Sequence, residues 1–184
     1  VLYRTSCEAW DPFAAEEHAE SLPLIGDAPL PVLAARRYTD EVARALLAFK
    51  DHGRLPAARL FRPGLTRAAA QLAQTLSSDV VLVPIPGSGS GFRRRGYDPV
   101  TELLRTPLPW PVQKRLLGHR LQIMGGSAHA GSNATTRRRR AGQKFRVAPS
   151  PPRSVVLVDD VLTTGATLAA AWRILSDHGH QVVA

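Results

Sequence analysis

The sequence predicts an α/β fold in which helices cover both faces of a central parallel sheet. Two observations lead to this prediction. The short runs at 80–85 and 155–158 are almost continuously apolar, as expected of strands that are buried on both faces. Segments with apolar residues at helical spacing alternate with these runs, and that order is typical of a parallel sheet flanked by helices.

The chain is expected to begin with a small irregular arm or hood at residues 1–34, followed by a main domain at residues 35–184. The arm contains four prolines, which interrupt regular backbone hydrogen bonding. A short strand is expected at 33–38, and Thr39 is expected to cap a helix. The apolar residues of that helix recur at a spacing of three or four and form one stripe: Val42, Ala45, Leu46 and Phe49.

Capping and helix-breaking residues indicate the next elements. Pro63 is expected to begin a second helix, because proline suits the first helical turn, and the polar run at 77–79 is expected to end it. The strand at 80–85 is followed by a glycine-rich segment that predicts a loop. Asp98 is then expected to start a short helix that reaches Leu104.

The last part of the chain contains a low-complexity segment and then the second strand. Residues 125–142 are rich in glycine, serine and arginine, which predicts a mobile segment. The strand at 155–158 and a helix at 168–175 follow. Residues 181–184 have the apolar character of one more strand.

The composition predicts a folded domain without a membrane span. The 184 residues are enough for a substantial core, and the hydrophobic content of 44% argues against a disordered chain. The longest apolar runs are far too short to cross a bilayer. Cys7 is the only cysteine, so neither a disulfide framework nor a cysteine-based metal site is expected. A reducing cytoplasm is the expected location.

The net charge of +9 favours an anionic partner. Polyphosphate ligands and nucleic acid both satisfy this charge. Arginine runs at 93–95 and 137–140 concentrate the charge in two places. A solvated basic surface without a dedicated role is the simpler interpretation of such runs, so the charge alone leaves the partner open.

The most informative segment is 155–167, in which an apolar strand ends in two acids and a turn rich in threonine. The first N–H groups of the following helix have no partner within the helix, and the helix dipole favours an anion there. A phosphate group is therefore expected at Thr163, Thr164, Gly165, Ala166 and Thr167. Asp159 and Asp160 would repel that phosphate unless they hold sugar hydroxyls or a metal. A phosphorylated ribose satisfies both requirements.

A simpler interpretation of this segment is a surface strand that ends in two acids, with a threonine cap on the next helix. That interpretation leaves the three threonines and the glycine after the acids without an explanation.

A second candidate site follows the strand at 80–85. Glycine and serine expose backbone N–H groups there, which can surround a pyrophosphate. Ligands of open α/β sheets bind at the carboxyl ends of strands, so this loop and the two acids are expected to face one crevice. The spacing matches neither a P-loop nor a dinucleotide fingerprint. The residues expected to meet the pyrophosphate are Pro84, Ile85, Pro86, Gly87 and Ser88.

The segment 155–167 resembles the phosphoribosyl-pyrophosphate (PRPP) motif of type I phosphoribosyltransferases. In that family the acid pair holds the ribose 2′- and 3′-hydroxyls, and the turn binds the 5′-phosphate. Further segments resemble one branch, the ComF-like proteins, also called competence protein F or GntX-like. These segments run from Tyr38 through Phe49-Lys50 to Arg54, over Val83-Pro84-Ile85-Pro86 and Arg95-Gly96-Tyr97-Asp98-Pro99, and from His129 through Arg137 to Phe145.

The resemblance implies a type I phosphoribosyltransferase-like fold for residues 35–184 and covers the arm poorly. Relatives commonly carry an N-terminal four-cysteine zinc module, which is expected to be missing or truncated here. His129 stands where the family usually has glutamine, and Arg140 where it usually has asparagine. Arg137 and Phe145 keep their places in the pattern.

The activity implied by the resemblance is transfer of phosphoribosyl from PRPP to an unknown nitrogenous acceptor, with release of pyrophosphate. Mg²⁺ is the implied cofactor, bound through PRPP, with Asp159 and Asp160 as its candidate protein ligands. Arg95 and Arg137 would neutralise negative charge on the leaving pyrophosphate. With the acid pair, they complete the catalytic set that the resemblance implies. Catalysis would depend on positioning and electrostatics.

A non-catalytic module is the alternative from another functional class. The family name is linked to DNA uptake in competent bacteria, and the fold can serve as a ligand sensor or a nucleic-acid partner. DNA binding through 137–140 would survive loss of Asp159 and Asp160 and would weaken steeply with salt, whereas PRPP binding would be lost. The resemblance leaves the oligomeric state open, with a homodimer as one option.

Overall fold

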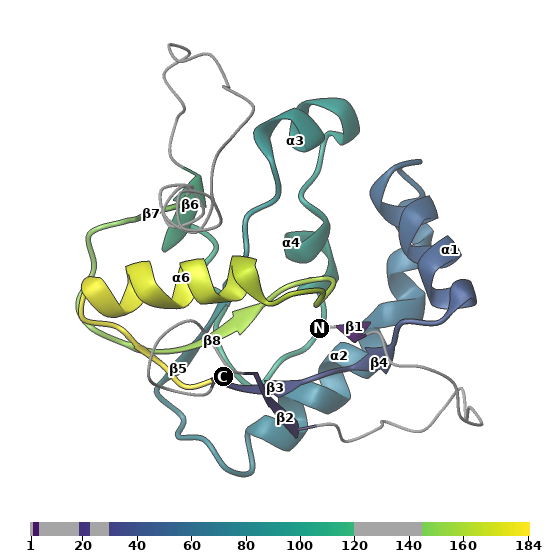
Figure 1. The fold of residues 1–184 in the computed structure, drawn as a ribbon. Helices are drawn as coiled ribbons and strands as arrows, with labels where there is room; N and C mark the ends of the chain where they lie inside the picture. Colours follow the sequence, from purple (N-terminus) through teal and green to yellow (C-terminus); the bar gives the residue numbers. More distant parts are fainter. Residues whose placement is uncertain (1, 4–18, 23–29, 120–144) are drawn as a thin grey trace.

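A computed structural model describes residues 2–3, 19–22, 30–119 and 145–184 of the chain (Figure 1). Its centre is a three-stranded parallel sheet with the order β5-β8-β9. The strands are β5 (Val80–Pro84), β8 (Ser154–Val158) and β9 (Gln181–Val182). A parallel bridge between Leu82 and Val112 adds a short segment to the outer edge of β5. The fold is therefore mixed α/β with a small parallel sheet, as the sequence predicts.

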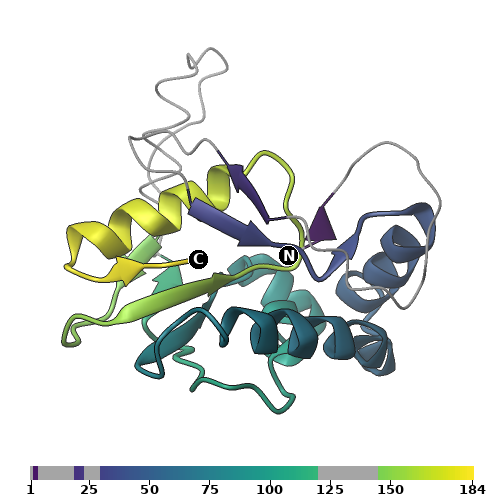
Figure 2. The same cartoon turned by 90° about the horizontal axis from the view of Figure 1, so that it is seen from below.

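Helices cover both faces of this sheet. One face contacts α6 (Ala166–Asp177), and Figure 2 shows α6 and α2 (Ala58–Leu72) on opposite sides of the strands. The other face packs against α2 and α4 (Pro99–Leu103). Successive side chains of a strand point to opposite faces, so burial on both faces explains why β5 and β8 are continuously apolar. The strand residues toward α6 are Val81, Val83, Val155 and Leu157, and those on the other face are Val80, Leu82, Val156 and Val158.

Two helices begin at the capping residues that the sequence predicts. Helix α1 (Asp40–Lys50) is capped by Thr39, whose hydroxyl accepts a hydrogen bond from the N–H of Val42 at 3.3 Å. Helix α4 is capped by Asp98, whose carboxylate accepts from the N–H of Thr101 at 2.8 Å. These local hydrogen bonds satisfy donors that have no partner within the helix.

The expected start of the second helix at Pro63 is wrong, because Pro63 lies inside α2. A short 3₁₀ turn, η1 (Leu55–Ala57), leads directly into α2, which begins at Ala58. Pro63 is exposed, whereas Ala58 and Phe61 in the turn before it are buried. Burial of this first turn offsets the helix hydrogen bond that the proline cannot donate.

The glycine-rich segment after β5 is shorter as a loop than the sequence predicts. Helix α3 (Gly89–Arg95) begins immediately after Ser88, whose hydroxyl caps it by accepting from the N–H of Gly91 at 3.1 Å. It ends at Gly96, whose φ of 78° is a left-handed conformation that glycine adopts without strain. The cap offsets the low helix propensity of the glycines.

The predicted strand at 33–38 is also wrong in its bounds, because two short strands occupy this region. Strand β3 (Leu30–Leu33) pairs antiparallel with β2 (Ala19–Leu22), and β4 (Arg36–Arg37) pairs parallel with β1 (Leu2–Tyr3). Apart from Ala34, the described residues of the expected irregular arm thus lie in strands. Val32 packs in the same core cluster as Val81 and Val83.

The remaining strands, β6 (Leu117–His119) and β7 (Phe145–Val147), form an antiparallel pair. The expected mobile segment at 125–142 lies outside the described residues. Helix α6 extends the predicted helix at 168–175 by two residues at each end. In the described part of the chain, no helix is both long and apolar enough to cross a membrane.

Candidate functional site

The two segments that the sequence predicts as ligand-binding lie side by side at the carboxyl ends of β5 and β8. We call this end of the sheet the sheet edge. Strands β5 and β8 are parallel neighbours, with Pro84 opposite Val158 in the register. The N–H of Ile85 donates to the carbonyl of Val158 at 2.8 Å, which continues the pairing one step beyond β5. The loop after β5 and the acid pair therefore leave the sheet together.

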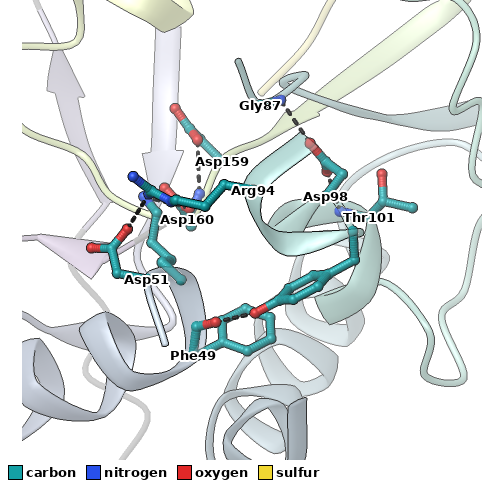
Figure 3. A network of polar contacts seen from close by, with 10 residues as sticks. Phe49, Asp51, Gly87, Arg94, Asp98, Thr101, Asp159 and Asp160 are labelled. Atoms are coloured by element: carbon teal, nitrogen blue, oxygen red, sulfur yellow. Dashed lines mark hydrogen bonds and ion pairs between the residues drawn. The ribbon is translucent and has the colours of Figure 1, made fainter. Parts of the chain in front are cut away.

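The acid pair is held by one backbone contact and one ion pair. Asp159 accepts a hydrogen bond from the N–H of Asp160 at 2.8 Å (Figure 3). Asp160 forms an ion pair with Lys50, with 2.7 Å between Nζ and Oδ2. The Asp160 side chain is only 11% exposed, so this contact is largely shielded from solvent. The cation comes from the last residue of α1, an element outside the sheet.

The pKa of Asp159 is raised to about 7, first by burial and second by the negative charge of Asp160. The hydrogen bond from the Asp160 N–H and the charge of Lys50 oppose this shift. Two carboxylates this close resist ionising together, because like charges in a partly desolvated site repel. Asp159 therefore gains or loses its proton near neutral pH. The negative charge of Asp160 is balanced by the ammonium group of Lys50.

The turn after the acids has the open geometry expected of an anion site. Thr163, Thr164 and Thr167 are exposed, whereas Gly165 is buried. Gly165 precedes α6 with a φ of 70°, a left-handed conformation that glycine adopts without strain. Since glycine has no side chain, it leaves the first helical turn uncovered. The Thr164 hydroxyl lies 3.5 Å from the N–H of Ala166, a long contact. The start of α6 thus presents backbone N–H groups and hydroxyls to solvent.

The loop after β5 is fixed by Asp98. One carboxylate oxygen of Asp98 accepts from the N–H of Gly87 at 2.7 Å, and the other caps α4 through Thr101 (Figure 3). A Cβ atom on Gly87 would lie 2.6 Å from Asp98 Oδ2, so no larger residue fits without displacing this carboxylate. The glycine is needed for this close approach, and Asp98 sets where the loop lies.

Arg95 folds back over the start of its own helix, beside this loop. A Cβ atom on Gly91 would lie 2.5 Å from Arg95 Nη2, and one on Gly87 would lie 3.8 Å from the same atom. The buried Nε of Arg95 has no hydrogen-bond partner among the described residues. The guanidinium therefore carries positive charge to the segment expected to meet pyrophosphate. Arg137, the other predicted arginine, lies outside the described residues.

The C-terminal end of α1 is attached to the segment that follows α3. The hydroxyl of Tyr97 donates to the carbonyl of Phe49, and the centroids of the two rings lie 5.6 Å apart. Asp51 forms an ion pair with Arg94 at 2.8 Å, with both side chains substantially exposed. Three elements thus surround the sheet edge: α1, the loop leading into α3, and the turn before α6.

The roles of Lys50 and Asp98 at the site were not predicted from the sequence. The sequence predicts Asp98 as the cap of a helix. It does not indicate the second hydrogen bond of this carboxylate, which comes from the N–H of Gly87. Lys50 lies in a segment that resembles the ComF-like pattern, but nothing local in the sequence indicates its acidic partner.

The acid pair has the oxygen donors that Mg²⁺ prefers. Among the described residues, no group of three or more histidine, cysteine, aspartate or glutamate side chains converges on one point. Two adjacent carboxylates fit an ion that keeps several waters and takes its other ligands from a phosphate, rather than an ion enclosed by protein alone.

Comparison with known proteins gave no relative: no family model, curated protein or solved structure matches the chain.

Proposed function

We propose that this protein binds PRPP together with Mg²⁺ and transfers its phosphoribosyl group to a nitrogenous acceptor, releasing pyrophosphate. We further propose that the parallel sheet belongs to a type I phosphoribosyltransferase-like fold. The observation that carries the proposal is the 2.8 Å hydrogen bond from Ile85 to Val158, which joins the two candidate loops at one sheet edge. A ligand with a phosphate at one end and a pyrophosphate at the other needs such a pair of loops.

We assign each part of PRPP to a different part of the protein. The 5′-phosphate is assigned to the turn at 163–167, where backbone N–H groups and hydroxyls are presented to solvent. The ribose hydroxyls are assigned to Asp159 and Asp160, because ionised carboxylates accept hydrogen bonds. The pyrophosphate is assigned to residues 84–88, over which Arg95 extends. The acceptor base is the part without an assigned contact.

The proposed reaction forms one bond and breaks another at C1 of the ribose. A nitrogen lone pair of the acceptor forms the C1–N bond. The C1–O bond breaks, and pyrophosphate leaves with the electron pair of the C1–O bond. An acceptor N–H proton is released to solvent. Arg95 would stabilise the charge that develops on the leaving group, and the acid pair would hold the ring in position. When bound, Mg²⁺ would supply further charge neutralisation at the pyrophosphate.

A calorimetric titration of PRPP, with and without Mg²⁺, tests the proposal. We expect Mg²⁺-dependent binding by the natural protein and its loss in the Asp159→Asn/Asp160→Asn variant. The matched control is Asp79→Asn/Asp177→Asn, which makes the same charge change at exposed acids away from this sheet edge. The control should bind PRPP like the natural protein.

The same variants distinguish PRPP binding from the nucleic-acid alternative. If the natural protein and the acid-pair variant bind duplex DNA equally, neither binds PRPP, and affinity falls steeply with salt, the phosphoribosyltransferase proposal is wrong. Loss of PRPP binding in the acid-pair variant alone supports it. Screening of nitrogenous bases for pyrophosphate release would then identify the acceptor.

A further inference from the structure

We propose that Lys50 is a positioning residue for the acid pair, which makes the C-terminal end of α1 part of the ligand site. This inference rests on the proposed function. It deepens that function by adding a residue from a third element, α1, whose Lys50 forms an ion pair with Asp160 at the sheet edge.

The contact between Lys50 and Asp160 is short and shielded. Lys50 Nζ lies 2.7 Å from Asp160 Oδ2, and the two side chains are 31% and 11% exposed. Within the described part of the chain, no other cation forms an ion pair with either acid. Charge-assisted hydrogen bonds of this length fix the orientation of a carboxylate as well as its charge.

The backbone on both sides of Lys50 is held in place. Phe49 accepts a hydrogen bond from the Tyr97 hydroxyl, and Asp51 pairs with Arg94 at 2.8 Å. Val161, in the turn after the acids, packs on the same apolar cluster as Phe49. Lys50 therefore projects from an anchored position, which lowers the entropy cost of holding its ammonium against Asp160.

This arrangement has a direct consequence for an anionic ligand. Asp159 and Asp160 lie next to each other at a site proposed to bind two phosphate groups. Lys50 neutralises Asp160 and holds Oδ2, which leaves Oδ1 to accept a hydrogen bond from a ribose hydroxyl. Without the ammonium, Asp160 would be free to rotate and its charge would repel the phosphates. Lys50 thus supports ligand binding without having to touch the ligand.

Calorimetric titration of PRPP with Mg²⁺ into four variants tests this role. Lys50→Met and Lys50→Gln remove the charge, whereas Lys50→Arg retains it. Lys114→Met removes the same charge from an exposed lysine and is the matched control. We expect Lys50→Met and Lys50→Gln to weaken PRPP binding by about tenfold or more, and Lys50→Arg to recover most of the loss. Lys114→Met should bind like the natural protein.

Circular dichroism melting curves show whether each variant is folded, and Lys50→Gln serves if Lys50→Met does not fold. Unchanged PRPP affinity in a folded variant without the charge would overturn the inference. Equal losses in Lys50→Arg and Lys50→Met would also overturn it, because packing rather than charge would then explain the effect. If the natural protein itself does not bind PRPP, the proposed function fails first, which is a distinguishable result.

Discussion

At the scale of single residues, the site depends on contacts made by a few charged side chains with little exposure to solvent. Asp160 is balanced by Lys50, and Asp98 joins the loop after β5 to α4. Among the described residues, Asp159 forms no ion pair, and it accepts a hydrogen bond from the backbone N–H of Asp160. Burial therefore dominates its titration and raises its pKa to about 7.

The raised pKa of Asp159 predicts that stability falls as pH rises. An unfolded aspartate titrates near 3.8, so the folded state binds more protons between about pH 4 and 7. The contribution of Asp159 is present below that range and is lost as pH rises through 7. The loss is on the order of 1–4 kcal/mol.

Urea unfolding of the ligand-free protein and of Asp159→Asn between pH 5 and 8 measures this effect. Asparagine does not titrate, so the variant should gain stability relative to the natural protein as pH rises. A difference between the two proteins that stays constant over this range would show that Asp159 is an ordinary carboxylate.

At the scale of elements, helix α3 controls where Arg95 lies. Its first turn contains glycines, and the guanidinium of Arg95 occupies the space that a side chain at Gly91 would need. Gly89 lies in the same turn, but a Cβ atom there would be 3.7 Å from Arg93 Nη1, an ordinary contact distance. The two glycines therefore have similar effects on the helix and different effects on Arg95.

Replacement of Gly91 by alanine should displace Arg95 while the helix remains intact. The added Cβ would lie 2.5 Å from the flexible end of the Arg95 side chain, which can move away. Alanine favours a helix over glycine by about 0.5–1 kcal/mol, so the free energy of unfolding should not decrease. PRPP affinity should fall by about tenfold, the effect of losing a charge-assisted contact.

Gly89→Ala is the control for this prediction, because it makes the same change in helix propensity without contact with Arg95. Titrations of PRPP into both variants compare them directly. Similar affinities for Gly91→Ala and Gly89→Ala would mean that Arg95 has no role in binding the ligand.

At the scale of the whole molecule, local signals in the sequence predicted the sheet and part of the site. The apolar runs at 80–85 and 155–158 predicted β5 and β8, because strands buried on both faces contain few polar residues. Parallel neighbours end at the same edge, so the meeting of their loops also followed from the sequence.

Other elements and contacts differ from the prediction or lie beyond it, some for local reasons and one because it joins distant parts of the chain. Pro63 predicts the start of a helix, yet α2 begins five residues earlier, where its first turn buries Phe61. The segment from Gly89 reads as a loop, yet the Ser88 cap makes it helical. The pairing of Lys50 with Asp160 depends on how α1 packs beside the sheet edge, which no local pattern encodes.

Hydrogen–deuterium exchange followed by mass spectrometry shows whether the two loops at one sheet edge form a single PRPP site, as we propose. Saturating PRPP with Mg²⁺ should slow exchange of backbone N–H groups both at 85–91 and at 163–168. Exchange at the start of α2 should not change. Slower exchange in only one of the two loops, or in neither, would contradict a shared site.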